Sequence, residues 1–576
     1  MPEPGQDLST PPLMRRAVLL LAFAGATTPA VALADDVPGD VVPADFARLV
    51  FDTGRVAETP AEPGIIRLQL HGEEQLRYEH LRSFPLDVTA TRNRDFPGAT
   101  SDSLGQNDFV SHWFRITPTL QLGAKLRIVG QADLTGIIAG DLAHDTGADQ
   151  TPRGDPNGNG YNGFDNVQPR WLYLEWTSPV GLLRVGQQPS HWGMGLVAND
   201  GDHPSLFGDY RYGNIVEQVL FATKPLGIDS PFVVALAGNL VYRDNVAILT
   251  NGDHAFQGIL AAFYERGPDM LGVYGVYRDQ NHSESAEPTY FNYTDSIHVG
   301  VIDLAGHFAR RIAAAGEDAY LFGSFEAATE LGSTNEERTI YQLPGGPWTK
   351  IQTYGGAASL GVVLAGRQGA RPGKQVIERP DLYGRVVAQV EVGYASGDAN
   401  PDDTTEKRFV FDPNHKVGLL LFDEVMRWQT ARAAVAAQDC QLANCVRPQP
   451  GASLLPSNGG VFGAQYVYPT AVYRPRPWLD LKAGAVIAQT TADYVDPYRV
   501  ALQGAYVSYS GGDSKRHDLG VELDGGFEAR QPLGPVLRLQ LGAQAGVLFP
   551  GGALADATGM TMKTPWIAVG RVGLQY

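Results

Sequence analysis

Long hydrophobic runs are missing from most of this 576-residue sequence. A transmembrane helix needs about 20 consecutive, mostly apolar residues. Hydrophobic residues make up 43% of the chain, yet no stretch beyond the N-terminal leader approaches that length. Membrane-spanning helices are therefore excluded.

Basic clusters and cysteines are scarce as well. The chain has 45 Lys and Arg against 63 Asp and Glu, which gives a formal net charge of −18, and it contains no basic run. Because nucleic-acid binding relies on clustered Lys and Arg, we expect no nucleic-acid partner. Cys440 and Cys445 lie in one polar connection, and in an exported protein we expect them to form a small-ring disulfide. Two thiolates alone would make a poor zinc site.

A catalytic constellation is also missing. Ser190 and His191 are adjacent, but neighbours on a strand point to opposite faces, and no G-x-S-x-G elbow accompanies them. His203 and His254 stand apart in polar connections. The sequence therefore predicts neither an enzyme nor a required cofactor.

What the sequence does contain is a repeated unit, from about residue 65 to residue 576. Runs of roughly 10 to 16 residues with alternating polar and apolar side chains are each followed by a turn. The turns alternate between tight ones and long polar connections, at 80–108, 139–167, 189–212, 279–292, 333–349, 396–460 and 491–516. This rhythm predicts an up-and-down antiparallel sheet, which inside a bilayer must close into a transmembrane β-barrel.

The pattern places about eighteen strands, although sixteen remains an alternative. We expect them at 65–79, 109–122, 125–138, 168–177, 181–188, 213–223, 231–242, 255–265, 270–278, 294–308, 317–331, 350–365, 382–396, 461–473, 478–490, 517–530, 536–549 and 563–576. Single-chain bacterial barrels favour even numbers, with short periplasmic turns and long outer loops. An even count places both ends of the barrel chain on the periplasmic side.

Side-chain parity separates a lipid-facing set from a lumen-facing set. In the first strand Leu68 and Leu70 alternate with Arg67 and Gln69. In the segment 518–530 one face carries Leu519, Val521, Leu523, Phe527 and Ala529, and the other carries Asp518, Glu522, Asp524, Glu528 and Arg530. Five charges on one face of a strand need water. A soluble exported β-protein would show the same alternation of side chains. The alternation of tight turns and long connections is therefore also needed to predict a barrel.

The N-terminal residues resemble an export signal. Met14-Arg15-Arg16, an apolar run and a small-residue site ending at Ala34 predict a signal peptide over 1–34, with Met14 as an alternative start. Residues 35–64 are expected to form a periplasmic arm, and 65–576 the barrel.

Barrels of 16 to 18 strands leave a water-filled lumen. Parity places the following charged residues on the wall of that lumen: Arg67, Glu73, Arg77, Arg115, Arg127, Asp133, Arg184, Arg385, Glu391, Glu522, Asp524 and Arg571. Because the signs are interleaved, each residue is open to two interpretations, pairing within the wall or direct contact with a permeating solute.

The connection 396–460 is the candidate constriction loop. It contains an apolar run at 417–422 and a helix-like segment at 423–438, with Phe422, Arg427 and Trp428 as its expected contacts. Such an apolar loop needs cover. We expect it to fold into the pore, with packing on the rim or against a partner as alternatives.

A weak cation motif lies at 155–160. Asp155, Asn157 and Asn159 place oxygen ligands at alternate positions, as in a calcium loop, but position twelve is Asn166 instead of Glu. A loop Ca²⁺ site is one interpretation, and a flexible Asn/Gly turn is the other.

Two segments resemble alginate-export-type outer-membrane porins. They are residues 183–188 (LRVGQQ), followed by WGMG at 192–195 and NDGD at 199–202, and residues 391–403 (EVGYASGDANPDD). The resemblance covers a small part of the chain and implies an eighteen-strand monomeric pore. Alginate exporters line that pore with an excess of Arg and Lys, whereas the charges here are mixed.

Together these features predict an outer-membrane barrel of a Gram-negative bacterium that acts as a porin-like channel for small hydrophilic solutes or saccharides. A non-channel anchor, adhesin or envelope component is the alternative. Expected partners are outer-membrane lipid and the barrel-insertion machinery. The machinery would read the last strand, in which Trp566, Val572, Leu574 and Tyr576 alternate with other residues.

Overall fold

A computed structural model describes residues 66–84, 105–141, 166–203, 205–209, 213–281, 296–314, 317–336, 348–364, 386–438, 454–476, 478–534 and 536–576. The expected signal peptide and periplasmic arm lie outside these residues. So do Arg385, the expected disulfide between Cys440 and Cys445, and the candidate calcium ligands Asp155, Asn157 and Asn159. All of these stay predictions.

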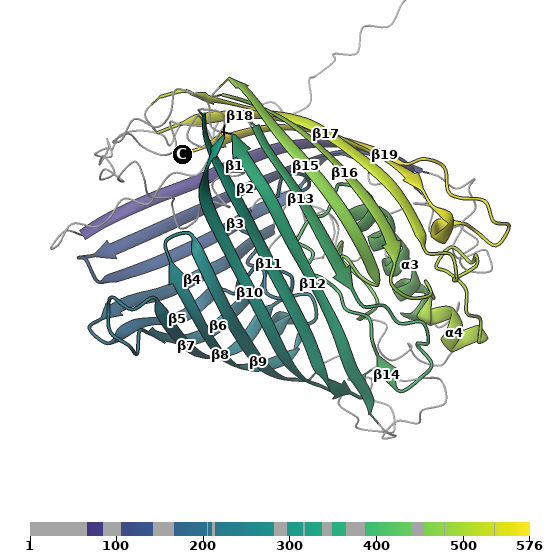
Figure 1. Ribbon diagram of the computed structural model, residues 1–576, viewed down its shortest axis with the longest axis horizontal. Coiled ribbons are helices and arrows are strands. Elements are labelled where there is room, and N and C mark those ends of the chain that lie inside the picture. Colours follow the sequence, from purple (N-terminus) through teal and green to yellow (C-terminus); the bar gives the residue numbers. More distant parts are fainter. Residues whose placement is uncertain are drawn as a thin grey trace, which may run out of the picture.

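Nineteen strands form one sheet in the described part of the chain, and eighteen of them build a closed wall (Figure 1). The wall strands are β1 (Ile66–Phe84), β2 (Gly105–Leu122), β3 (Leu126–Asp141), β4 (Asn166–Ser178), β5 (Gly181–Pro189), β6 (Ile215–Thr223), β7 (Phe232–Arg243), β8 (His254–Arg266), β9 (Asp269–Asn281), β10 (Ser296–Ala314), β11 (Glu317–Thr334), β12 (Thr349–Leu364), β13 (Val386–Ala395), β15 (Ala464–Arg476), β16 (Leu479–Thr490), β17 (Asp518–Pro532), β18 (Arg538–Pro550) and β19 (Trp566–Gln575).

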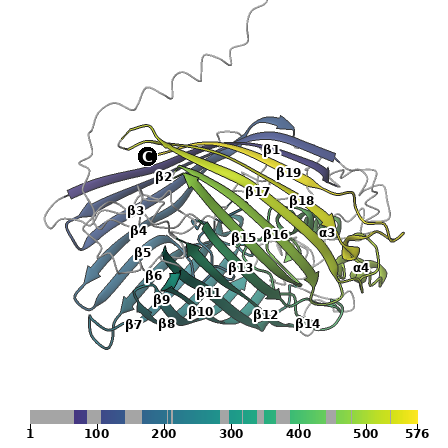
Figure 2. The same cartoon turned by 45° about the horizontal axis from the view of Figure 1, so that its top comes forward.

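Each wall strand pairs antiparallel with the next one, and β1 pairs with β19 to close the ring (Figure 2). The remaining strand, β14 (Thr405–Glu406), adds two residues in parallel beside the outer end of β12. The prediction of an eighteen-strand antiparallel barrel is confirmed, and the alternative of sixteen strands is wrong.

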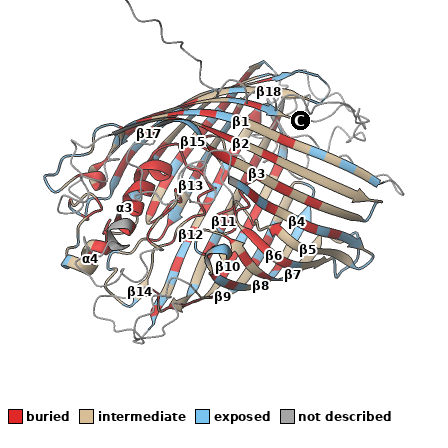
Figure 3. Ribbon diagram, turned by 180° about the vertical axis from the view of Figure 1, so that it is seen from behind, coloured by how far each residue is buried: buried red, intermediate tan, exposed pale blue. Residues whose placement is uncertain are grey.

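The alternation of side chains along β1 shows why the sequence chooses this fold. Leu68 is 68% exposed on the outer face, whereas Arg77, on the opposite parity, is 4% exposed. Positions of different burial alternate along the wall in the same way (Figure 3). Alternate residues of a strand thus form an apolar outer face and a polar inner face, with a period of two residues.

One parity assignment is wrong. Leu519, expected on the outer face of β17, is fully buried in the large hydrophobic cluster. Gly520 has a φ of +114°, and the pairing of β16 with β17 shifts register beside it. Such a β-bulge inserts one residue and reverses the faces beyond it, so alternation alone does not place Leu519.

Short helices lie in the connections and not in the wall. Those in the described ranges are η3 (Leu249–Asn251), the π-helix η6 (Leu421–Met426), α3 (Arg427–Gln438), α4 (Pro497–Gln503) and η8 (Gly552–Leu554). The side chain of Asp496 caps α4 by accepting from the Tyr498 amide, and Gly504 ends the helix in the left-handed region. No helix in the described ranges is long and apolar enough to cross a membrane.

Two long connections enter the barrel. We name residues 190–203, 205–209 and 213–214 the first inserted segment, and residues 396–438 and 454–463 the second inserted segment. The second carries η6 and α3, which the strands enclose in both Figure 1 and Figure 2. Its apolar residues pack in one buried cluster with Tyr466 of β15 and Val486 of β16.

A charge on the outer belt should destabilise the barrel more than the same charge inside it. Leu260, near the middle of β8, is 54% exposed on the outer face, whereas Gln257 of the same strand lines an interior cavity. We expect Leu260→Arg to lower the free energy of unfolding by about 2–4 kcal/mol in lipid vesicles. Gln257→Arg is the matched control and should cost less. Equal losses in denaturant titrations would contradict the assignment of the two faces.

Candidate functional site

The first inserted segment crosses the lumen and is held at two sides of the wall. It connects β5 to β6, yet Asp209 forms ion pairs with Arg77 of β1 and Arg571 of β19. Asp202 accepts from Arg115 of β2 at 2.9 Å. Wall residues on several other strands thus fix a connection that leaves β5.

Glu326 of β11 binds the same segment from the other side. Its carboxylate accepts hydrogen bonds from the Met194 amide and, at 3.0 Å, from the Leu196 amide. Gly193 makes this approach possible, because it has a φ of +58° and a Cβ there would lie 2.7 Å from the Cβ of Ala305. The segment is therefore held by main-chain groups.

Trp192 adds a side-chain anchor. Its indole N–H donates to Asp303 of β10 at 3.2 Å, and its ring stacks on Tyr274 of β9 with centroids 5.3 Å apart. A buried indole needs such an acceptor as well as an apolar surface, and the wall supplies both.

A second wall carboxylate holds the second inserted segment. Glu522 of β17 accepts hydrogen bonds from three successive amides, those of Leu419, Leu420 (2.8 Å) and Leu421 (2.7 Å). Gly418, with a φ of +75°, lies directly against this carboxylate. Three hydrogen bonds from successive amides to one side chain fix the start of η6.

The two segments also bind each other. The Asp412 amide donates to the Leu196 carbonyl at 2.7 Å, and the imidazole of His415 lies 3.2 Å from the Met194 carbonyl. The other ring nitrogen of His415 lies 3.0 Å from Glu391 of β13. Together the segments form a partition across the barrel interior.

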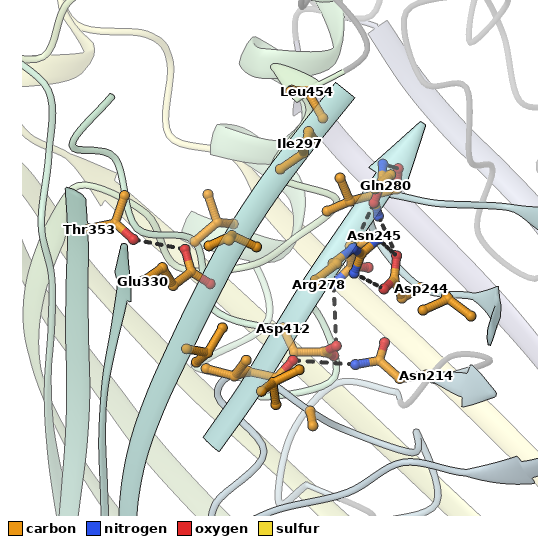
Figure 4. A pocket seen from close by; sticks show the side chains of 18 of the residues that line it. Asn214, Asp244, Asn245, Arg278, Gln280, Ile297, Glu330, Thr353, Asp412 and Leu454 are labelled. Atoms are coloured by element: carbon orange, nitrogen blue, oxygen red, sulfur yellow. Dashed lines mark hydrogen bonds and ion pairs between the residues drawn. The ribbon is translucent and has the colours of Figure 1, made fainter. Parts of the chain in front are cut away.

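An outer cavity of about 270 Å³ lies on the side of the long connections (Figure 4). Gln280 and Thr334, at the outer ends of β9 and β11, line it, as does Asp412 of the second inserted segment. Arg278 reaches Asp244 at 2.5 Å, and Thr353 donates to Glu330 at 2.7 Å. The cavity has four acidic and two basic lining residues: Asp244, Glu330, Glu406, Asp412, Arg278 and Arg408.

Two inner cavities lie on the side of the tight turns. One, of about 350 Å³, is lined by His71 and Gln75 of β1 and by four arginines, Arg115, Arg127, Arg530 and Arg571. The other, of about 610 Å³, is lined by Glu265 of β8 and His307 of β10. The partition therefore separates polar spaces that lie toward the two ends of the barrel.

Charged wall residues are mostly paired. Glu175 of β4 accepts from both Arg127 and Arg184 at 2.6 Å, and Arg115 makes two bonds to Asp133 at 2.7 and 2.9 Å. Interleaved charges of this kind neutralise one another. The donor and acceptor atoms that are not used in the pairs face the water of the lumen.

The residues predicted to line the pore fall into two groups. Glu73, Arg115, Arg127, Glu391 and Arg571 line the inner cavities. Arg77, Asp133, Glu522 and Asp524 are buried, and Arg67 and Arg184 are partly buried wall residues outside the three cavities. Phe422, Arg427 and Trp428 are at most 5% exposed and line none of these cavities. They hold the second inserted segment in place.

Sequence reasoning missed several residues of this site. Glu326, Asp303, Asp209 and the fully buried Arg170 were not among the expected lumen residues. The Gly193 and Gly195 pair in a polar connection was a usable signal, because paired glycines mark a close approach of the backbone. No local pattern, however, indicates that Glu326 is the partner.

A closed ring of strands with an apolar outer belt, a polar interior and inserted loops defines the class of this protein. Only a bilayer makes that distribution of side chains stable. The chain is an integral membrane β-barrel of the outer-membrane type.

Solved structures that are similar to the chain include the outer membrane protein OprD. OprD of Pseudomonas aeruginosa is 10% identical, with 90% of this chain and 95% of that chain covered and a TM-score of 0.43. OccK5 (OpdH) of the same species is 9% identical, with 88% and 97% covered and a TM-score of 0.42. OccAB2 of Acinetobacter baumannii is 9% identical, with 88% and 98% covered and a TM-score of 0.45. No protein-family model and no curated protein sequence matches the chain.

The two wall carboxylates should act independently on the two segments. In native-state hydrogen exchange we expect Glu522→Gln to speed exchange of the Leu419 to Leu421 amides, because a Gln side chain has one acceptor oxygen where the carboxyl group uses two. The Met194 and Leu196 amides should be unchanged. Glu326→Gln should give the reverse pattern, so each variant is the control for the other. Uniformly faster exchange in both variants would mean that the substitutions destabilise the whole barrel.

Two buried groups beside Phe411, those of Asp412 and His415, make this part of the second inserted segment sensitive to pH. Burial raises the pKa of Asp412 to about 7, with Asp244 adding to the rise, while bonds from Asn414 and the charge of Lys416 oppose it. Burial lowers the pKa of His415, but the facing Glu391 more than offsets that effect, so its pKa lies above the usual value.

Both shifts favour the protonated form in the folded protein, so their stabilisation is lost as the pH rises through the folded pKa values. Between about pH 5 and pH 8 the Asp412 shift alone corresponds to about 2–3 kcal/mol. We expect the opening free energy of the Phe411 amide, measured by hydrogen exchange, to fall over this range. Asp412→Asn should remove most of that dependence. A segment that is more stable at about pH 8 than at about pH 5 would show that other groups dominate.

Proposed function

We propose that the protein is a porin-like channel for passive diffusion of small hydrophilic solutes or saccharides across the outer membrane of a Gram-negative cell. The observation that carries this proposal is the set of polar cavities on both sides of the partition. Eighteen strands enclose more space than wall side chains can fill. Two inserted segments reduce that space without filling it.

The wall chemistry suits neutral, hydroxyl-rich solutes. Paired groups such as Arg115 and Asp202, which both line the inner cavity of about 350 Å³, present donors and acceptors side by side, and a sugar needs both. No energy source is required, because solute moves down its gradient through water-filled space. Selection would come from the narrowed cross-section and from these polar edges.

The resemblance to alginate-export-type porins implies a path for a polyanion, and the cavities do not favour that solute. The outer cavity has four acidic lining residues against two basic ones. A polyanion would be repelled there at neutral pH. The charge of the outer cavity therefore favours small neutral solutes over a polyanion.

The lipid-facing belt and the last strand suggest the other partners. Outer-membrane lipid would cover exposed residues such as Val572 and Leu574. Tyr576 continues the pairing of β19 by exchanging main-chain hydrogen bonds with Gly72 of β1, at 2.9 and 3.0 Å. We propose that the insertion machinery reads this strand before β1 closes on it.

Removing the apolar part of the partition should widen the path. We expect replacement of 417–438 by a short Gly/Ser linker to raise the single-channel conductance in planar bilayers, because the second inserted segment no longer narrows the lumen. Replacement of 557–559, at the tip of an exposed outer loop, is the control and should leave the conductance unchanged.

Glu522→Gln offers the same test without a deletion, since it loosens the segment and should give larger or noisier current steps. Wild-type protein that inserts folded but stays electrically silent would favour the anchor alternative. Unchanged conductance in both variants would remove the second inserted segment from the permeation path.

A further inference from the structure

Three potential metal ligands meet in the first inserted segment. His191 precedes a turn in which the Trp192 amide donates to the Ala198 carbonyl at 3.0 Å, and this turn folds the chain back on itself. Asp200 and His203 follow directly. As a result, one ligand atom from each of His191, Asp200 and His203 lies within 4.8 Å of the others.

The separations are near those of a transition-metal site. The Asp200 Oδ1 atom lies 2.8 Å from Nδ1 of His203 and 3.8 Å from Nδ1 of His191. The two imidazole rings stack with centroids 3.9 Å apart. In a tetrahedral zinc site with bonds of about 2.0–2.2 Å, neighbouring ligand atoms are roughly 3.2–3.5 Å apart. Small side-chain rotations would therefore bring all three onto one ion.

His191 supplies a second, independent observation. Its Nδ1 atom is buried and has no hydrogen-bond partner among the described residues. Buried polar atoms in native proteins nearly always have a partner, so an orphaned one needs an explanation. A neutral imidazole offers its unprotonated nitrogen to a metal, which is the most common use of histidine in metal sites.

The surrounding charges do not oppose a cation. Arg170 donates to the Asp200 carbonyl at 2.5 Å and fixes the backbone there. Arg170 and Arg115 both lie near Asp133, at 3.8 and 2.7 Å, and Arg115 also binds Asp202 at 2.9 Å. Two guanidinium groups thus face three carboxylates, those of Asp133, Asp200 and Asp202, so the local charge is net negative.

The cluster has access to solvent. His191 and His203 line the inner cavity of about 610 Å³, together with Asn199 and Ser205. A metal held by these three ligands of the first inserted segment would keep a coordination position open toward the cavity, for water or for a donor atom of a solute.

The geometry points to a divalent transition-metal site formed by His191, Asp200 and His203 on the inner side of the partition. Two imidazoles and one carboxylate suit Zn²⁺, Cu²⁺ or Ni²⁺, whereas Mg²⁺ and Ca²⁺ prefer all-oxygen sites. The site goes beyond passive diffusion of solutes. Its expected effect on current, a metal-dependent narrowing of the path as the ion ties residue 191 to residue 203, rests on the proposed channel.

Calorimetric titration of the full-length, detergent-folded protein with Zn²⁺ alone, after removal of metals by a chelator, tests the site. We expect one high-affinity Zn²⁺ per chain and no competition from Mg²⁺. His191→Gln and His203→Gln should each weaken binding about tenfold or more, as expected when a metal site loses a ligand or its support. His254→Gln, at the exposed outer end of β8, is the matched control and should bind like wild type.

Folding of each variant is checked by the heat-dependent gel mobility of the barrel. Folded wild-type protein that binds no Zn²⁺ overturns the inference, as does wild-type affinity in both folded histidine variants. In planar bilayers, Zn²⁺ should lower the wild-type current reversibly and leave that of His203→Gln unchanged. Zn²⁺ binding by a protein that conducts no current supports the metal site and contradicts the channel. Open channels without Zn²⁺ binding support the channel and contradict the metal site.

Discussion

Main-chain amides of a segment inside a membrane barrel need hydrogen-bond acceptors there. The arrangement of the two inserted segments depends on which wall residues supply those acceptors. Glu326 and Glu522 accept five such amides between them, from Met194 and Leu196 in one segment and from Leu419 to Leu421 in the other. Each carboxylate stands on a rigid strand and binds backbone, so it fixes the path of a loop whatever its side chains. The partition across the lumen follows from these two contacts.

The alternation of side chains along each wall strand gives the barrel one face for lipid and one face for water. Every second residue faces out, and the outer set is apolar enough to lie against hydrocarbon while the inner set carries the paired charges. The same wall can therefore bind the inserted segments with buried polar groups and still leave polar cavities. Inner residues thus serve two purposes, since Arg115 both anchors Asp202 and lines a cavity.

The strands of the wall could be predicted from the sequence alone, whereas the contacts of the two inserted segments could not. Alternation with a period of two gives the type and number of strands, and the apolar run with a helix-like tail at 417–438 indicated η6 and α3. Alternation fails at a bulge, as for Leu519 beside Gly520, because one inserted residue reverses the faces. It also carries no information about partners: Glu326 lies 132 residues from Met194, and Glu522 lies 101 residues from Leu421. The crossing of the first inserted segment was therefore not predictable.

The central claim is that a hydrated lumen persists around a partition held by Glu326 and Glu522. Swelling of proteoliposomes in saccharides of increasing size tests it most directly. The account predicts swelling with small sugars, a decline in rate as the sugar grows, and a shift of that decline to larger sugars in the Glu326→Gln, Glu522→Gln double variant. Folded wild-type protein and a folded double variant that admit no sugar of any size would contradict it.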